Sequence, residues 1–169
     1  MKLIFPFISI MLLLLSQSAL AQSCRTSLTQ TTPDADFIWL DDGTVRHLPT
    51  GMIWMRCSLG QTWTGTGCSG EARALTWTEA LDISDGQTFA GRSDWKLPTR
   101  QQLTTIVEKS CTLPSINRAA FPDTMPFPYW TATPFANDSG YSWAISFELG
   151  NVQFGYYDHD RFYVRLVAQ

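Results

Sequence analysis

The chain has 169 residues, with 12 basic and 15 acidic side chains and a formal net charge of −3. This slight acidic excess argues against a binder of nucleic acid or other polyanions. Once the leader described next is removed, about 150 residues remain, which is enough for one domain with a buried core but not for two of ordinary size.

Residues 1–21 have the pattern of a secretory signal peptide. A lone Lys2 precedes the apolar run from Leu3 to Leu15, and small residues at Ala19 and Ala21 supply a cleavage site. The unbroken apolar run is too short to span a bilayer comfortably, so stable membrane insertion is not expected. We therefore expect an exported protein, located in the periplasm or outside the cell.

The four cysteines of the exported part are Cys24, Cys57, Cys68 and Cys111. An oxidising compartment favours disulfides over free thiols, and four cysteines allow three pairings. Cys57 and Cys68 flank a short loop rich in glycine and threonine, so local closure favours that pair. It leaves Cys24 to tie the N-terminal arm to Cys111.

Two other fates of these cysteines are less favoured. A zinc site would need closer ligands, but no Cys-x-x-Cys occurs, and His47 and His159 are remote in sequence. Lipidation of Cys24 usually requires small residues just before the cysteine, and Gln22 fits that pattern poorly.

The first part of the domain is predicted to be a small antiparallel unit. Residues 22–35 form a polar arm, and a single domain is expected over residues 36–169. Turn residues at 41–43 and 49–51 separate three strand candidates, which are Asp36–Leu40, Thr44–Leu48 and Met52–Met55.

Two helices are predicted next. Arg73–Ile83 holds a capping box of Thr76 and Glu79, with apolar residues at helical spacing behind it. The second helix is predicted over Thr99–Lys109. Leu97 precedes a proline and therefore disfavours the helical conformation, so the helix begins after this pair. Gln102 completes a second capping box with Thr99.

The last third carries the clearest strand pattern. Large apolar residues alternate with small or polar ones from Tyr141 to Leu149, which predicts a strand with one buried face. That face is made of Tyr141, Trp143, Ile145, Phe147 and Leu149. A Gly-Asn turn then leads into a second strand that buries Val152, Phe154 and Tyr156. A final strand, Phe162–Val167, directs Arg165 away from the core, where we expect it to pair with an acid such as Asp94.

Several sequence blocks occur in a specific order. They include Thr50-Gly51-Met52-Ile53-Trp54-Met55-Arg56-Cys57, Thr76-Trp77-Thr78-Glu79-Ala80-Leu81, Asp94-Trp95-Lys96-Leu97-Pro98-Thr99 and Tyr163-Val164-Arg165-Leu166-Val167. In this order they resemble the Lcl C-terminal domain family, named for the C-terminal domain of the Legionella collagen-like adhesin. The resemblance implies an α+β, C-type-lectin-like domain in which two helices pack on a twisted antiparallel sheet. The family also resembles the formylglycine-generating enzyme family, which likewise has a Leu-Pro-Thr entry into a helix.

The resemblance does not imply an activity, because such folds host both binders and enzymes. The formylglycine-generating enzymes act through cysteines late in the domain, and no cysteine follows Cys111 here. The chain also lacks a Gly-x-Ser-x-Gly or a His-Glu-x-x-His motif. We therefore expect no catalytic residues.

Three groups of residues are candidates for ligand binding. A sugar or sulfated ligand could stack on tyrosine and accept hydrogen bonds from arginine in the run Tyr156, Tyr157, Asp158, His159, Asp160 and Arg161, although a solvated turn is the favoured interpretation because Asp and His are ordinary turn residues. Trp63, in the glycine- and threonine-rich loop, is the tryptophan most expected to be exposed. Asn137 and Asp138, with Glu148 and Asp158, could offer oxygen ligands to calcium, but the sugar-binding triplet of C-type lectins is absent.

The expected function is that of an exported, non-enzymatic recognition module that binds a glycan or surface polymer without a cofactor. One alternative is a structural or protein-interaction subunit of the cell envelope, to which the acidic balance and the missing sugar triplet point. A second alternative is an unrecognised enzyme on the same fold.

The disulfides should matter for stability because the arm and the loop bring little core of their own. Replacing either cysteine pair by serine should lower the free energy of unfolding by about 2 to 4 kcal/mol. Denaturant unfolding measures this effect, and mass spectrometry after alkylation should find no free thiol in the exported protein. Four alkylated cysteines would contradict the expectation.

Overall fold

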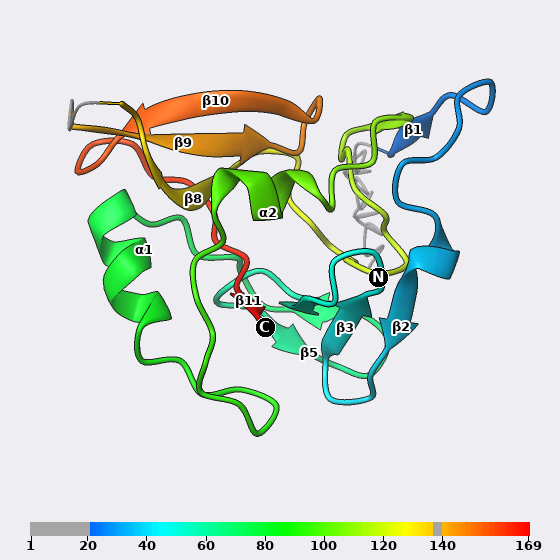
Figure 1. The fold of residues 1–169 in the computed structure, drawn as a ribbon, viewed down its shortest axis with the longest axis horizontal. Helices are drawn as coiled ribbons and strands as arrows, with labels where there is room; N and C mark the ends of the chain where they lie inside the picture. The colour runs from blue at the N-terminus through cyan, green and yellow to red at the C-terminus, as the bar shows by residue number, and fades with distance from the viewer. Residues whose placement is uncertain (1–20, 137–139) are drawn as a thin grey trace, which may run out of the picture.

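The computed structural model describes residues 21–136 and 140–169. The expected leader therefore lies outside the described residues except for Ala21, as do Asn137 and Asp138. The chain folds into a mixed structure with more sheet than helix (Figure 1). In chain order its elements are β1 (Ser23–Cys24), η1 (Asp34–Asp36), β2 (Phe37–Trp39), β3 (Thr44–His47), β4 (Ile53–Met55), β5 (Thr62–Trp63), β6 (Cys68–Ser69), α1 (Trp77–Ser84), α2 (Arg100–Thr104), β7 (Cys111–Thr112), β8 (Pro128–Pro134), β9 (Tyr141–Ser146), β10 (Asn151–Tyr156) and β11 (Val167–Ala168).

One sheet joins the start of the domain to its end. Its four antiparallel strands run in the order β11-β4-β3-β2, and Val167 of β11 pairs with Trp54 of β4. The predicted unit of three short strands is thus confirmed. Gly43 and Gly51, at φ 85° and 72°, occupy the left-handed region that the two connecting turns require. The predicted last strand is shorter than expected, because only Val167–Ala168 pairs with β4.

A second sheet contains the predicted hairpin. Its strands run in the order β10-β9-β8, with Phe154 opposite Trp143 and Tyr156 opposite Tyr141. Figure 1 shows this sheet at one end of the molecule and β3 and β5 at the other, with α2 between them. The backbone N–H of Arg100 in α2 donates to the hydroxyl of Thr133 in β8, which ties the helix to this sheet.

Both capping boxes are confirmed, but both helices are shorter than predicted. Thr76 caps α1, which begins at Trp77 rather than at Arg73. Thr99 caps α2, which ends at Thr104 instead of continuing to Lys109. The chain tightens there into turns with Ile106 N–H bonded to the Leu103 carbonyl, 3.3 Å away.

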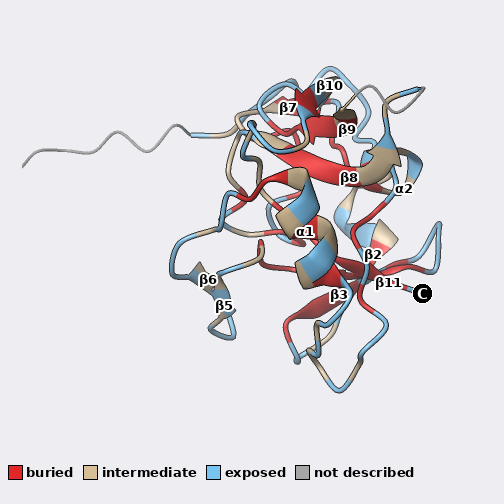
Figure 2. Ribbon diagram, turned by 90° about the vertical axis from the view of Figure 1, so that its left-hand side faces the viewer, coloured by how far each residue is buried: buried red, intermediate tan, exposed pale blue. Residues whose placement is uncertain are grey.

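The core consists of two packed clusters, which Figure 2 shows as buried segments in red. One cluster surrounds Trp54 and Tyr129, and the other surrounds Trp95 and Trp130. Leu97, which precedes the proline at the start of α2, is only 4% exposed. The Leu-Pro-Thr stretch therefore anchors α2 in the second cluster before the chain turns.

The cysteines form the pairs Cys57–Cys68 and Cys24–Cys111, as loop closure favours. The first bridge closes the loop that carries β5 and β6. The second joins β1 to β7, where the two cysteines are directly opposed in register. Since a thiol held in a disulfide cannot carry a thioether lipid, this structure is that of an unlipidated Cys24. The two bridges also indicate an oxidising compartment.

Besides the Cys24–Cys111 bridge, the buried carboxylate of Glu108 holds the N-terminal arm. It accepts hydrogen bonds from the backbone N–H groups of Thr31, Thr32 and Ser110, at 3.1, 2.8 and 2.9 Å. Burial opposes ionisation of this carboxyl, but these hydrogen bonds outweigh it and lower its pKa to about 2. The arm is therefore attached through a charged group that must stay ionised.

Arg165 does not pair with Asp94, contrary to the sequence-based expectation. Asp94 binds the guanidinium of Arg92 instead, through Nε at 2.9 Å. The Arg165 side chain is fully buried and donates to the carbonyls of Met55 and Arg56 and to the hydroxyl of Thr124. Carbonyl and hydroxyl oxygens, rather than a carboxylate, accept from its two terminal nitrogens, while its buried Nε has no hydrogen-bond partner among the described residues.

Replacing Arg165 by lysine should destabilise the fold by about 3 kcal/mol, because one ammonium cannot reach the separated acceptors that the guanidinium spans. Urea unfolding at neutral pH measures the change. The same replacement at Arg46, an exposed residue of β3, is the matched control and should alter stability little. Equal unfolding midpoints for the two variants would refute a structural role for Arg165.

Replacing Glu108 by glutamine should loosen the arm at Thr31 and Thr32, although the Cys24–Cys111 bridge still tethers it, and lower stability by about 2 kcal/mol at neutral pH. Because the folded-state pKa is depressed, the contribution of Glu108 is full above the ordinary value of 4.5 and is lost as the pH falls toward about 2. Between pH 4.5 and about 2, the free energy of unfolding of the wild type should thus fall more steeply with decreasing pH than that of the glutamine variant. Urea unfolding at a series of pH values tests this, with Glu71→Gln at an exposed position as the control.

Candidate functional site

The second sheet exposes part of the aromatic side that the alternation predicts to be buried. Ile145 and Phe147 are buried as expected, but Leu149 is 64% exposed. On β10, Val152, Phe154 and Tyr156 are exposed at 45%, 56% and 47%. The side chains that face inward are instead the small ones, namely Ser142, Ala144, Ser146 and Gly155.

Lack of space on the inner side explains this exposure. A Cβ on Gly155 would lie 2.7 Å from both Phe162 and Trp130, so the inner side of β10 has no room for a side chain at this position. Ser142 fits beneath β9 because its hydroxyl donates to the carbonyl of Thr133 at 2.8 Å. The bulky residues of the hairpin are therefore forced onto the outer face.

Five rings form a continuous surface on this outer face, which we call the aromatic face: Phe135, Tyr141, Trp143, Phe154 and Tyr156. Neighbouring ring centroids lie close together, 3.9 Å for Tyr141 and Tyr156 and 4.7 Å for Phe135 and Trp143. The ring of Phe154 contacts those of Phe135, Tyr141 and Trp143, at 5.5, 5.6 and 6.4 Å. Because Phe135, Tyr141 and Trp143 are half-buried, the more exposed Phe154 and Tyr156 sit on a supported base.

Polar groups border the aromatic face. The guanidinium of Arg100 lies over the ring of Trp143, 4.7 Å from its centroid. A hydrogen bond with Tyr156 raises the pKa of the Tyr141 hydroxyl above its ordinary value, so this group stays protonated at neutral pH. The surface therefore combines ring faces with neutral hydroxyl groups and one cation.

The predicted run from Tyr156 to Arg161 is divided between two sides of the molecule. Tyr156 joins the aromatic face, and His159 lies edge-on to it at 6.0 Å. Tyr157 instead stacks on Trp77 of α1, with centroids 4.1 Å apart. The run therefore does not form one site.

The charged members of the run serve local contacts. Asp158 accepts a hydrogen bond from Thr78 at 2.9 Å, and Asp160 accepts one from the backbone N–H of Tyr156 at 2.8 Å. Arg161 forms an ion pair with Glu79 of the α1 capping box, at 3.1 Å. The contacts of Asp158 and Arg161 attach the turn to α1, and the contact of Asp160 closes the turn onto the end of β10. Arg161 is thus engaged rather than free for a ligand.

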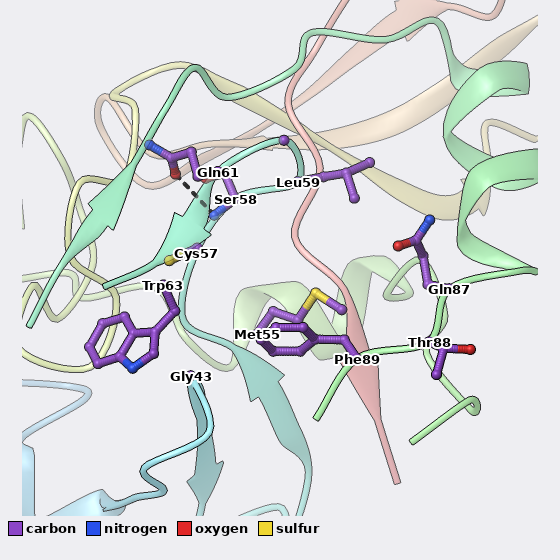
Figure 3. Close-up of a pocket in the computed structure, with 11 residues that line it drawn as sticks. Gly43, Met55, Cys57, Ser58, Leu59, Gln61, Trp63, Gln87, Thr88 and Phe89 are labelled. Carbon is purple, nitrogen blue, oxygen red and sulfur yellow. Dashed lines mark hydrogen bonds between the residues drawn. The ribbon is translucent and has the colours of Figure 1, made fainter. Parts of the chain in front are cut away.

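Trp63 is half-buried rather than exposed. The guanidinium of Arg56 lies 4.0 Å from its ring centroid. Its other neighbours form a cavity of about 190 Å³, shown in Figure 3, between the disulfide-closed loop and the chain that follows α1. This cavity was not predicted, because its walls come from segments that are distant in sequence.

No residue group points to a metal site in the described part of the chain. Asn137 and Asp138 lie outside the described residues, and Asp158 is bonded to Thr78. Over residues 21–136 and 140–169, no three histidine, cysteine or acidic side chains gather closely enough to hold an ion. The helices of these residues also lack the length and apolar character that a membrane crossing requires.

Of the five rings of the aromatic face, only Tyr156 is a candidate from the sequence; the four that sequence reasoning missed are Phe135, Tyr141, Trp143 and Phe154. Trp143 was assigned to the core because it alternates with small residues, and Phe135 lies in the segment after a proline. The one sequence signal that could have revealed the outer face is Gly155, because a glycine within a strand often marks a close approach of another element.

Comparison with known proteins identifies the family of the domain. The Lcl C-terminal domain matches residues 43–168, which is most of the chain and includes both helices, the aromatic face and the cavity. No protein with a curated description matches this sequence. Because the match extends from β3 to β11 and covers most of the chain, the protein belongs to the Lcl C-terminal domain family.

Proposed function

We propose that this protein is an exported, non-enzymatic recognition module that binds a glycan or surface polymer through the aromatic face. The observation that carries the proposal is the outward position of that face, with Phe154 56% and Tyr156 47% exposed. Contiguous exposed apolar surface is uncommon on monomeric proteins and often marks a binding site. The family match supports an adhesin-like role at a surface.

The chemistry of the aromatic face suits a sugar. The apolar sides of a pyranose ring expose C–H groups, which pack on the electron-rich faces of aromatic rings. The hydroxyl groups of Tyr141 and Tyr156 and the guanidinium of Arg100 can form hydrogen bonds with sugar hydroxyls or acidic substituents. The supporting contacts among the rings reduce the entropy lost when a ligand orders them.

Other observations support the remaining parts of the proposal. Disulfides form in oxidising compartments, so the two bridges support a periplasmic or extracellular location. We infer a C-type-lectin-like fold from the family resemblance together with the mixed helix and sheet content. The non-enzymatic role is supported by the histidines, because His47 is buried and bonded to Thr50, while His159 lies beside Tyr156 on a turn.

A protein-interaction role is the second candidate, and the position of β10 favours it. β10 is the edge strand of its sheet, and its six residues include no charged side chain and no proline. Edge strands without such residues can pair with a strand from another protein. This candidate uses the strand edge, whereas the glycan candidate uses the faces of the rings.

Replacing Phe154 or Tyr156 by alanine should weaken glycan binding at least about tenfold, because each exposed ring that stacks on a sugar contributes on the order of 1 to 3 kcal/mol. Stability should change little, since both side chains are about half exposed. A glycan array on the mature protein, with and without calcium, selects a ligand, and calorimetry then measures its affinity for each variant.

Phe127→Ala is the matched control, because Phe127 is 49% exposed but lies before β8, at the opposite end of that strand from Phe135. Its affinity for the selected glycan should equal that of the wild type. An array without a binder, or equal losses for Phe127→Ala and Phe154→Ala, would overturn the glycan proposal. Binding of an envelope protein that is lost on Val152→Pro would support the second candidate instead.

A further inference from the structure

The cavity beside Trp63 is a second candidate binding site, remote from the aromatic face. It is formed by the loop after β4, by β5 and by the segment that follows α1. Figure 3 places Met55 and Phe89 at its centre, Trp63 and Gly43 on one side, and Leu59 and Gln87 on the other. Figures 1 and 2 both show β5 and β10 at opposite ends of the molecule.

The size of the cavity suits one ring-sized group. Its volume is about 190 Å³. An enclosed apolar cavity of about 150 Å³ holds a single benzene ring, and pockets for drug-sized ligands begin at about 300 Å³. The ligand is therefore a single residue or substituent of a larger molecule rather than an extended chain.

The lining carries no ionisable side chain. Apolar contact comes from Met55, Leu59, Phe89 and Trp63, and polar groups come from two glutamines and from Ser58 and Thr88. A charged ligand entering this cavity would lose hydration without gaining an opposite charge. The lining therefore selects a neutral ligand with one apolar side and one polar side.

The two glutamine side chains point to an amide. The Oε1 atom of Gln61 accepts from the backbone N–H of Ser58 at 3.1 Å, which orients the amide and leaves its NH₂ group to donate. The amide of Gln87 has no hydrogen-bond partner among the described residues and points toward Leu59 in Figure 3. A carboxamide both donates and accepts, so it matches the N–H and C=O groups of a ligand amide.

Covalent and packing contacts hold part of the cavity wall. The Cys57–Cys68 bridge closes the loop on one side. A Cβ on Gly43 would lie 2.9 Å from Trp63 and 3.1 Å from Phe89, so these three residues already pack closely. Such a preformed cavity loses little conformational entropy when a ligand enters.

We propose that this cavity binds the acetamido group and ring of a neutral N-acetylated sugar. The acetyl methyl packs on the thioether of Met55 and the ring of Phe89, and the amide of the ligand pairs with Gln87 while the Gln61 NH₂ group donates. The proposal does not rest on the aromatic face, because no residue is shared between the two sites.

The test is a titration of the ¹⁵N-labelled mature protein with N-acetylglucosamine, followed by NMR. The signals of the Gln87 side-chain amide and the Trp63 indole N–H should shift, with a dissociation constant of about a millimolar, as expected for so small a ligand. Glucose, which lacks the amide, and glucosamine, which is charged, should shift these signals at least about fivefold less at equal concentration.

Gln87→Leu should weaken the binding of N-acetylglucosamine at least about fivefold, whereas Gln153→Leu, at a half-buried glutamine of β10, should not change it. Phe154→Ala should also leave it unchanged, which separates this site from the aromatic face. Absence of shifts at the Gln87 and Trp63 signals, equal shifts with glucose, or wild-type affinity in Gln87→Leu would each overturn the proposal. The Gln87→Leu variant should unfold at the same temperature as the wild type, so that its loss of binding reflects the missing amide and not a damaged fold.

Discussion

The buried guanidinium of Arg165 is the interaction on which the arrangement of the chain depends. It reaches the carbonyls at the end of β4 and the hydroxyl of Thr124, so one side chain from the C-terminal segment joins three parts of the chain. Its charge is surrounded by the rings of Phe121 and Tyr129, at 4.9 and 5.8 Å from their centroids. A buried cation that is stabilised only by dipoles and ring faces tolerates little displacement of its partners, since losing one leaves charge unsolvated.

The same interaction positions the neighbourhood of the cavity. Ser58, which lines the cavity, contacts the Arg165 guanidinium at 3.4 Å and the hydroxyl of Tyr129 at 2.7 Å. Burial raises the pKa of Tyr129, so this hydroxyl remains a neutral partner. Cys57 follows Arg56 directly, and its disulfide thus begins from backbone that Arg165 already holds. The cavity walls are therefore continuous with the core rather than added to it.

Sequence reasoning succeeded where the deciding interaction is local. Each capping box joins residues three apart, and each hairpin turn is set by adjacent residues, so Thr76 and Thr99 could be assigned from the sequence alone. The disulfide pairing followed in the same way from the short loop between Cys57 and Cys68. The orientation of the β9–β10 hairpin does not follow from the alternation of its residues. Gly155 signals a close approach, but Phe162 and Trp130, which exclude a side chain there, both lie outside the hairpin.

Strand geometry explains why the run from Tyr156 to Arg161 is divided between two sides of the molecule. Successive side chains of a strand point to opposite faces, so Tyr156 and Tyr157 could not share one ligand where β10 ends. Tyr156 joins Tyr141 on the outer face, and Tyr157 turns inward to stack on Trp77. A surface on this fold is instead built from residues two apart along a strand and from their cross-strand neighbours, as in the pairing of Phe154 with Trp143. The aromatic face satisfies that condition, and a run of adjacent residues does not.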